Sequence, residues 1–219
     1  MKIDNATVAV LKNFAKINPS ILVKEGNVLK TVSPSKTIMA KATVSTKFSR
    51  QFAIYNLDRF ISTISLFNEP ELNFNDNSVS ITDGNRNTNY FYADESIIDQ
   101  KISDKNINLP STDVKFTLTE ANMKDVERAL GVLGLPEIVV SGENGKILLQ
   151  AADTKNPSSD VYSIEIGKTD KNFKAIFKSE NIRIIPGDYE VSVCSQGISH
   201  FVGKQAEYWI AVEQKSTFN

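Results

Sequence analysis

The apolar positions near the start of the chain recur with the period of an amphipathic helix. The apolar face of residues 4–18 holds Val8, Leu11, Phe14 and Ala15. The other face holds Asn5, Ala9, Lys12 and Lys16. Asp4 is a suitable N-cap, and Asn18 precedes a proline, which disfavours the α conformation. The pattern therefore predicts a helix between Asp4 and Asn18.

Short runs rich in β-branched residues follow this helix and predict strands over residues 21–23, 28–32, 38–44 and 52–55. Asn56 can cap a second helix over residues 57–67, which has a continuous apolar stripe. Three further strands are predicted over residues 71–75, 79–82 and 88–92. The first half therefore consists of a helix, four strands, a second helix and three strands.

The periodic pattern stops between Asp94 and Asp113. This stretch contains two lysines and five carboxylates, and its polar, acidic composition is typical of a connector. We therefore predict an N-terminal domain over residues 1–93, a connector over 94–113 and a C-terminal domain over 114–219.

The second half repeats the order of elements. Thr119 can cap a helix over residues 120–133, and Ser179 can cap a short helix over 180–185. The buried stripe expected for the first of these helices is Met123, Val126, Leu130 and Leu133. Strands are expected over residues 114–119, 137–141, 146–151, 161–166, 173–177, 188–194, 198–203 and 208–212. The predicted fold class is α+β, with two repeated domains that each pack two helices on a curved antiparallel β-sheet.

The composition argues against catalysis. The chain has one cysteine, Cys194, and one histidine, His200. These counts exclude an internal disulfide and the usual zinc-cluster spacings, and they fit a reducing compartment. Residues 142–146 lack the spacing of a phosphate loop and are explained by a hairpin turn. No apolar run is long enough for a membrane helix. We expect no enzyme activity, no cofactor, no metal site and no membrane partner. The net charge of −1 neither favours nor excludes nucleic acid.

Several segments in both halves resemble one known family. They are Val10–Asn18, Ala53–Leu57, Ile64–Leu66, Pro186–Tyr189 and Ala206–Glu213. In these segments and in their order, the chain resembles the sliding clamps of tailed bacteriophages, the processivity factors of phage DNA polymerases. The resemblance spans nearly the whole chain, and it implies two domains of the DNA-clamp type.

The resemblance implies a closed homotrimeric ring that encircles duplex DNA without reading its sequence. The ring would be placed by an ATP-dependent clamp loader and would tether the DNA polymerase, in the cytoplasm of the host cell. The implied DNA-facing cations are Lys12, Lys16, Arg59, Lys124, Arg128 and Arg183. Solvated faces of amphipathic helices are the alternative explanation for these cations. The third helix departs from a basic face because it also carries Glu120, Asp125 and Glu127.

The resemblance also implies two protein contacts. The subunit interface is expected at Tyr90, Phe91, Tyr92, Val161, Tyr162 and Ile164; alternatively, the aromatic residues pack only in their own core. A pocket for partner peptides is expected at Ile107, Leu109, Pro110, Tyr208, Ile210 and Val212; alternatively, these residues only seal the connector onto the second domain. The alternative function is a β-rich oligomeric virion structural protein that does not encircle DNA.

Overall fold

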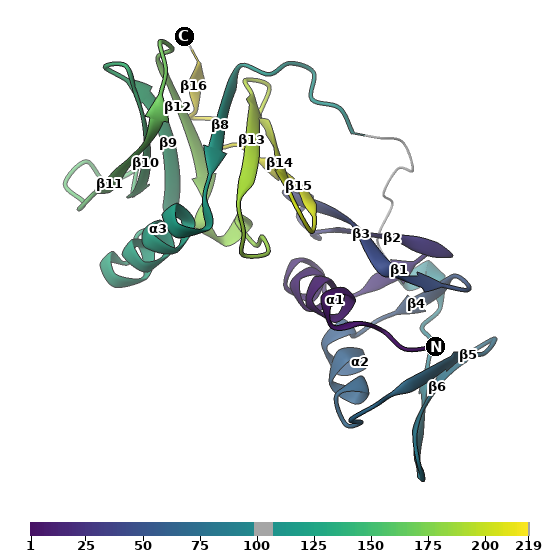
Figure 1. Ribbon diagram of the computed structural model, residues 1–219. Helices are drawn as coiled ribbons and strands as arrows, with labels where there is room; N and C mark the ends of the chain where they lie inside the picture. The colour runs from purple at the N-terminus through teal and green to yellow at the C-terminus, as the bar shows by residue number, and fades with distance from the viewer. Residues whose placement is uncertain (99–106, 219) are drawn as a thin grey trace. The chain divides into compact units, whose positions relative to one another are not determined.

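The computed structural model describes residues 1–98 and 107–218, in two compact units (Figure 1). The N-terminal unit comprises Met1–Lys105 and the C-terminal unit Asn106–Asn219. Residues 99–106, which belong to the predicted connector, lie outside the described residues. Helices and antiparallel strands make up both units, as the α+β prediction requires.

Two helices of the N-terminal unit begin at the caps that the sequence predicts. Helix α1 (Asn5–Ile17) is capped by Asp4, and α2 (Leu57–Ile64) is capped by Asn56, whose side chain accepts from the Arg59 amide. The two helices pack against each other, and α1 also packs on β3 (Ile38–Phe48). Helix α2 ends at Ile64, three residues before the predicted end, because tighter turns replace the α-helical hydrogen bonds at Leu66 and Phe67.

The strands of the N-terminal unit pair antiparallel. Strands β1 (Ile21–Val23) and β4 (Phe52–Ile54) form one pair, and β2 (Gly26–Val32) pairs with β3. A three-stranded sheet has the order β5-β6-β7, formed by Glu71–Phe74, Ser78–Asp83 and Arg86–Phe91. A 3₁₀ turn at Glu95–Ile97 follows. Phe14 and Phe60, both almost fully buried, belong to the core between helices and strands.

Asp4 does more than cap α1. Its carboxylate accepts from the Thr7 amide at 2.9 Å and from the hydroxyls of Ser45 and Thr46 on β3 at 2.7 and 2.6 Å. These hydrogen bonds, with that of Thr46 the largest cause, hold the pKa of the carboxyl well below its usual range. Asp4 therefore holds the start of α1 on the sheet most strongly when it is ionised.

Replacing Asp4 with alanine is expected to lower the free energy of unfolding by about 1–2 kcal/mol. Because the folded pKa is depressed, the stabilisation is present above an unfolded pKa of about 4 and is lost as the pH falls below it. Urea unfolding should show that the wild type loses about 1 kcal/mol between pH 5 and pH 3 through this group. Asp4→Asn, which does not titrate, should lack this component, and equal losses in both proteins would contradict the assignment.

The C-terminal unit contains a five-stranded sheet in the order β11-β10-β9-β12-β16. Its strands are Tyr162–Lys168, Lys146–Ala152, Glu137–Glu143, Phe173–Lys178 and Thr217–Phe218. The other strands, β8 (Val114–Leu118), β13 (Tyr189–Cys194), β14 (Ile198–Gly203) and β15 (Glu207–Ala211), pair in the order β8-β13-β14-β15. Strand β16 was not predicted, and it fixes Phe218 beside Phe173.

Helix α3 (Glu120–Leu133) has the predicted bounds and the predicted cap, Thr119. It packs against β10 and β11 (Figure 1). Its buried residues are Met123, Val126 and Ala129, so the predicted stripe is wrong at its C-terminal end. Leu130 is only half-buried there, and Leu133 is exposed.

The predicted helix over residues 180–185 does not form; a 3₁₀ turn at Ser179–Asn181 takes its place. The backbone of Ile185 is bound by two buried tyrosines. Its amide donates to the Tyr208 hydroxyl at 3.1 Å, and its carbonyl accepts from the Tyr189 hydroxyl at 2.5 Å. Pro186 also disfavours the α conformation at Ile185. The described residues therefore contain one α-helix in the C-terminal unit and two in the N-terminal unit.

Candidate nucleic-acid interface

The exposed helix face of the N-terminal unit is basic. Lys12 and Lys16 lie on the solvent side of α1, which contains no carboxylate, and Arg59 is exposed on the neighbouring α2. Helix α2 contains one carboxylate, Asp58. Both helices are held in place by their caps and their buried side chains. These cations therefore project from two regular, well-packed helices.

The exposed face of α3 is mixed in charge. Lys124 pairs with Glu120 at 2.5 Å, and Arg128 pairs with Asp125 at 3.0 Å. The hydrogen bond that Lys124 donates to the Glu120 carboxylate, followed by the charge of that carboxylate, raises the pKa of Lys124. Both predicted DNA-binding cations of this helix are therefore in ion pairs within the helix.

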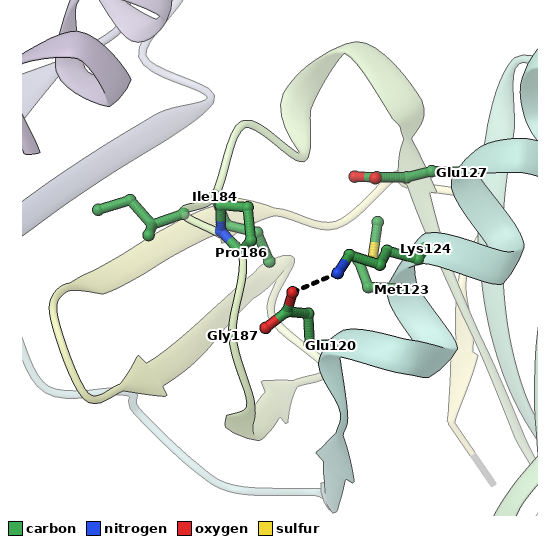
Figure 2. Close-up of a pocket in the computed structure, with 8 residues that line it drawn as sticks. Glu120, Met123, Lys124, Glu127, Ile184, Pro186 and Gly187 are labelled. Atoms are coloured by element: carbon green, nitrogen blue, oxygen red, sulfur yellow. Dashed lines mark ion pairs between the residues drawn. The ribbon is translucent and has the colours of Figure 1, made fainter. Parts of the chain in front are cut away.

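A hollow of about 80 Å³ lies between α3 and the segment that ends at Gly187 (Figure 2). Its wall consists of Glu120, Met123, Lys124 and Glu127 from α3, and of residues 184–187. Figure 2 shows the Glu120–Lys124 ion pair at this hollow. The hydrogen bonds of the Ile185 backbone with the hydroxyls of Tyr189 and Tyr208 hold the wall opposite α3 in place.

Arg183 was predicted to project from a fourth inner helix, and this placement is wrong. It lies in the irregular segment after the 3₁₀ turn, where its Nε donates to the Glu180 carbonyl at 2.8 Å. The side chain is exposed, but no helix orients it.

The six residues predicted for a peptide pocket differ in exposure. Ile107 and Leu109 are half-buried and Pro110 is exposed. Tyr208 and Ile210 are 0% exposed, and Val212 is buried as well. In the C-terminal unit these three side chains are core residues, and Tyr208 also supports Ile185. Sequence alternation missed this role because Trp209, which lies between them, is buried too.

A second hollow, of about 180 Å³, lies near the point where the connector enters β8. It is lined by Asp113, Val114, Lys171, Phe173 and Phe218. Lys171 donates to the Asp113 carbonyl at 2.5 Å, and the Asp113 carboxylate accepts from the Ser195 amide at 2.7 Å. The end of the connector is thus fixed beside two aromatic rings.

Each unit has a sheet edge that carries exposed apolar residues. Among the described pairings of its unit, β7 pairs only with β6, and β11 pairs only with β10. Phe91 at the end of β7 is 67% exposed, and Val161 immediately before β11 is 57% exposed. Tyr90, Tyr92, Tyr162 and Ile164 are half-buried. Tyr90 contacts the Phe60 ring and Tyr92 stacks on Phe52, so part of the aromatic surface does pack in its own core.

His200 and Cys194, the two titratable residues considered for catalysis, make hydrogen-bonding or packing contacts within the fold. His200 lies 3.0 Å from a Glu207 oxygen and stacks on Trp209. Cys194 is fully buried, with its Sγ 3.2 Å from the Ser111 hydroxyl. Within residues 1–98 and 107–218, no three His, Cys, Asp or Glu side chains are grouped so that they could hold a metal ion. None of the helices in this part of the chain is both long and apolar enough to span a membrane.

The fold matches those of solved DNA clamps. The PCNA2–PCNA3 complex from Sulfolobus tokodaii aligns with a TM-score of 0.69 at 14% identity, covering 95% of this chain and 96% of that one. A. fulgidus PCNA, solved with the C-terminal region of FEN-1, aligns with a TM-score of 0.69 at 13% identity and 96% coverage of both chains. At these identities the likeness defines the fold, which is the two-domain repeat of the clamps.

Sequence comparison identifies the family to which this chain belongs among the clamps. Residues 2–103 match the family model described as DNA polymerase processivity factor, and residues 111–214 match gp45 sliding clamp, C terminal. The sliding clamp of Vibrio phage KVP40 is 34% identical over 97% of this chain and 99% of its own length. That of Escherichia phage RB69 is 30% identical over 99% of both chains. The chain belongs to the bacteriophage sliding clamps, the processivity factors of DNA polymerase in DNA replication.

Proposed function

We propose that three copies of this chain close head to tail into a ring around duplex DNA in the host cytoplasm. An ATP-dependent clamp loader places the ring, which then tethers the DNA polymerase and catalyses no reaction itself. The observation that carries this proposal is the pair of edge strands, β7 in one unit and β11 in the other. Because each unit has one such edge, each copy can bind one neighbour through β7 and another through β11. Head-to-tail contacts of this kind form a closed ring when the rotation between copies is right.

The proposed subunit contact pairs β7 of one copy with β11 of the next. Long edge strands in soluble proteins are usually blunted by charge, proline or cover. Here β7 and β11 carry charged residues but no proline, and Phe91 at the end of β7 and Val161 just before β11 expose apolar surface. The contact would be completed by four half-buried side chains on these strands or next to them: Tyr90, Tyr92, Tyr162 and Ile164. Packing in the core of the N-terminal unit covers part of the Tyr90 and Tyr92 rings, but it does not cover Phe91.

The proposed DNA contact is made by cations that approach phosphates without reading bases. Its candidates are Lys12, Lys16, Arg59, Lys124, Arg128 and Arg183. Exposure of all six side chains supports this proposal, and the regular helices α1, α2 and α3 support it for the first five.

The proposed site for partner peptides lies at the end of the connector. Half-buried Ile107 and Leu109 and exposed Pro110 are the candidates that a peptide can reach. The hollow beside Phe173 and Phe218, which Asp113 and Val114 at the end of the connector also line, supports this location. Tyr208, Ile210 and Val212 would support the site from the core and would not contact the peptide.

The proposed ring is tested by two measurements on the full chain. Light scattering at several concentrations should give the mass of a trimer. The protein should stimulate its DNA polymerase on primed circular DNA only when the loader and ATP are present. A virion structural protein, the alternative function, would assemble into larger particles and leave the polymerase unaffected; the family membership does not favour it.

Replacing Lys12, Lys16 and Arg59 together by alanine should weaken processive synthesis. All three side chains are exposed, so the melting temperature should remain close to that of the wild type. The loss should be largest at low ionic strength and shrink as the salt concentration rises, because screening then weakens the same phosphate attraction in the wild type. Product length across a series of salt concentrations is the measurement. Products of wild-type length at every concentration would remove these residues from the DNA contact.

A further inference from the structure

The hollow at the point where the connector enters β8 combines aromatic rings with a cation. Phe173, which is buried, and Phe218, which is half-buried, supply the rings, and the two residues are paired between β12 and β16. Lys171 is the cation that lines the same hollow. Its volume of about 180 Å³ is enough for on the order of ten waters, so a side chain of a partner can enter it.

The backbone of Lys171 is fixed at the base of this hollow. Its amide donates to the Thr169 hydroxyl at 3.1 Å. A Cβ atom added at Gly142 of β9 would lie 2.4 Å from the Lys171 carbonyl oxygen and 2.4 Å from the Phe173 ring. Glycine at this position thus permits the close approach of both groups to the sheet. The cation and the buried ring are therefore held at one place, against the same residue of β9.

The ammonium group of Lys171 donates to an uncharged acceptor, the Asp113 carbonyl, at 2.5 Å. The Asp113 carboxylate accepts instead from the Ser195 amide and the Ser111 hydroxyl, each at 2.7 Å. The hydrogen bond from the Ser195 amide, followed by that from Ser111, holds the pKa of Asp113 below its usual value, and the charge of Lys171 contributes least. Asp170, next to Lys171 in the chain, is exposed and is not one of the residues that line the hollow. A carboxylate from outside would therefore offer Lys171 a stronger acceptor than the one it has.

We infer that Lys171 selects partner peptides in which an aspartate or a glutamate stands next to the apolar side chain that enters this hollow. The inference rests on the proposed function and deepens it, because it assigns the chemistry of the peptide that binds at the connector end. The apolar side chain packs on Phe173 and Phe218, and the carboxylate replaces the Asp113 carbonyl as the acceptor of Lys171. A peptide without the carboxylate leaves Lys171 with its neutral acceptor and binds more weakly.

Short overlapping peptides that cover the DNA polymerase of the same phage test the inference on the full chain. They carry a fluorescent label and are blocked at both ends, so that side chains supply their carboxylates. The peptide that binds the wild type most tightly, by fluorescence anisotropy, is then made with each Asp or Glu changed to Asn or Gln. One of these changes should weaken binding about three- to tenfold. Lys171→Gln should weaken binding of the unchanged peptide by the same factor, and the two changes together should cost no more than either alone.

Two further variants control for general charge effects. Lys171→Arg keeps the charge and should bind the peptide within about twofold of the wild type. Lys174→Gln removes an equal charge from an exposed position of β12 that does not line the hollow, and it should also stay within about twofold. Thermal melting and light scattering check folding and trimer mass. Equal losses in Lys171→Gln and Lys174→Gln, or losses that add when peptide and protein are both changed, would overturn the inference.

Two other outcomes are distinguishable from these. The C-terminal peptide of the polymerase is also made with a free carboxyl end, and dependence of binding on that end instead of a side chain would overturn the inference. If no polymerase peptide binds the wild type, the proposed peptide site fails, and the inference fails with it. If a peptide binds and the wild type stimulates the polymerase with loader and ATP, but Lys171→Gln binds the peptide as tightly, only the inference fails.

Discussion

Replacing Phe91 with glutamate is expected to convert the trimer into monomers at micromolar concentration. Phe91 is 67% exposed in the single chain, so the change should cost the monomer little stability. In the proposed ring the same position is covered by the neighbouring copy, where an unpaired carboxylate loses its hydration without gaining a partner. Polymerase stimulation should be lost together with the trimer, because an open chain is not retained on DNA.

Leu66→Glu is the matched control for this change. Leu66 is 68% exposed and follows the end of α2, so it lies outside both edge strands. Light scattering should give a trimer for Leu66→Glu and a monomer for Phe91→Glu, while thermal melting shows whether each chain remains folded. A folded Phe91→Glu protein that stays trimeric on dilution would mean that β7 is not the edge used in assembly.

Replacing Ile210 with serine is expected to lower the free energy of unfolding by about 3–4 kcal/mol. Ile210 is 0% exposed, so the change creates a cavity and buries a hydroxyl group. Leu109→Ser, at a half-buried position in the connector, should affect stability much less and should instead weaken binding of a polymerase-derived peptide. Urea unfolding and peptide titration of both variants separate the two roles.

The outcome that would contradict this division is equally specific. If Ile210→Ser unfolds at the wild-type urea concentration but no longer binds the peptide, Ile210 lines the pocket and is not a core residue. If Leu109→Ser unfolds as easily as Ile210→Ser, the connector is part of the core, and the peptide site must be sought elsewhere on the chain.

Local features of this fold were predictable from sequence. Asp4, Asn56 and Thr119 are the observed caps because an N-cap needs only a side-chain acceptor and the amides that follow it. The succession of helices and strands along the chain, apart from β16 and the helix over residues 180–185, also followed from residue type and turns. These features depend on neighbours in the chain, which the sequence displays directly.

Features that depend on distant residues were missed. The predicted helix over residues 180–185 fails because hydroxyls of Tyr189 and Tyr208 bind the backbone of Ile185. Strand β16 needs the edge of β12, about 40 residues earlier in the chain. Ile210 was assigned to a pocket because alternation separates the two faces of a strand but does not show whether a face is covered.

The candidate site was predictable only in part. The basic character of α1 and the mixed charge of α3 can be read from residue types alone. The position of Arg183 cannot, since it depends on the helix that does not form. The hollow beside α3 also requires the structure, because residues 184–187 are held opposite Met123 by contacts from other strands.

The burial of Cys194 makes this protein convenient for spectroscopic labelling. The thiol is the single one in the chain, and it is closed to solvent within β13. Thiol reagents need an accessible thiolate, so they should react slowly with the folded wild type. A cysteine introduced at an exposed position outside the proposed contacts, such as Leu66, can then carry a dye while the native thiol remains in place. Ring opening and movement on DNA become measurable by fluorescence without first removing a core residue.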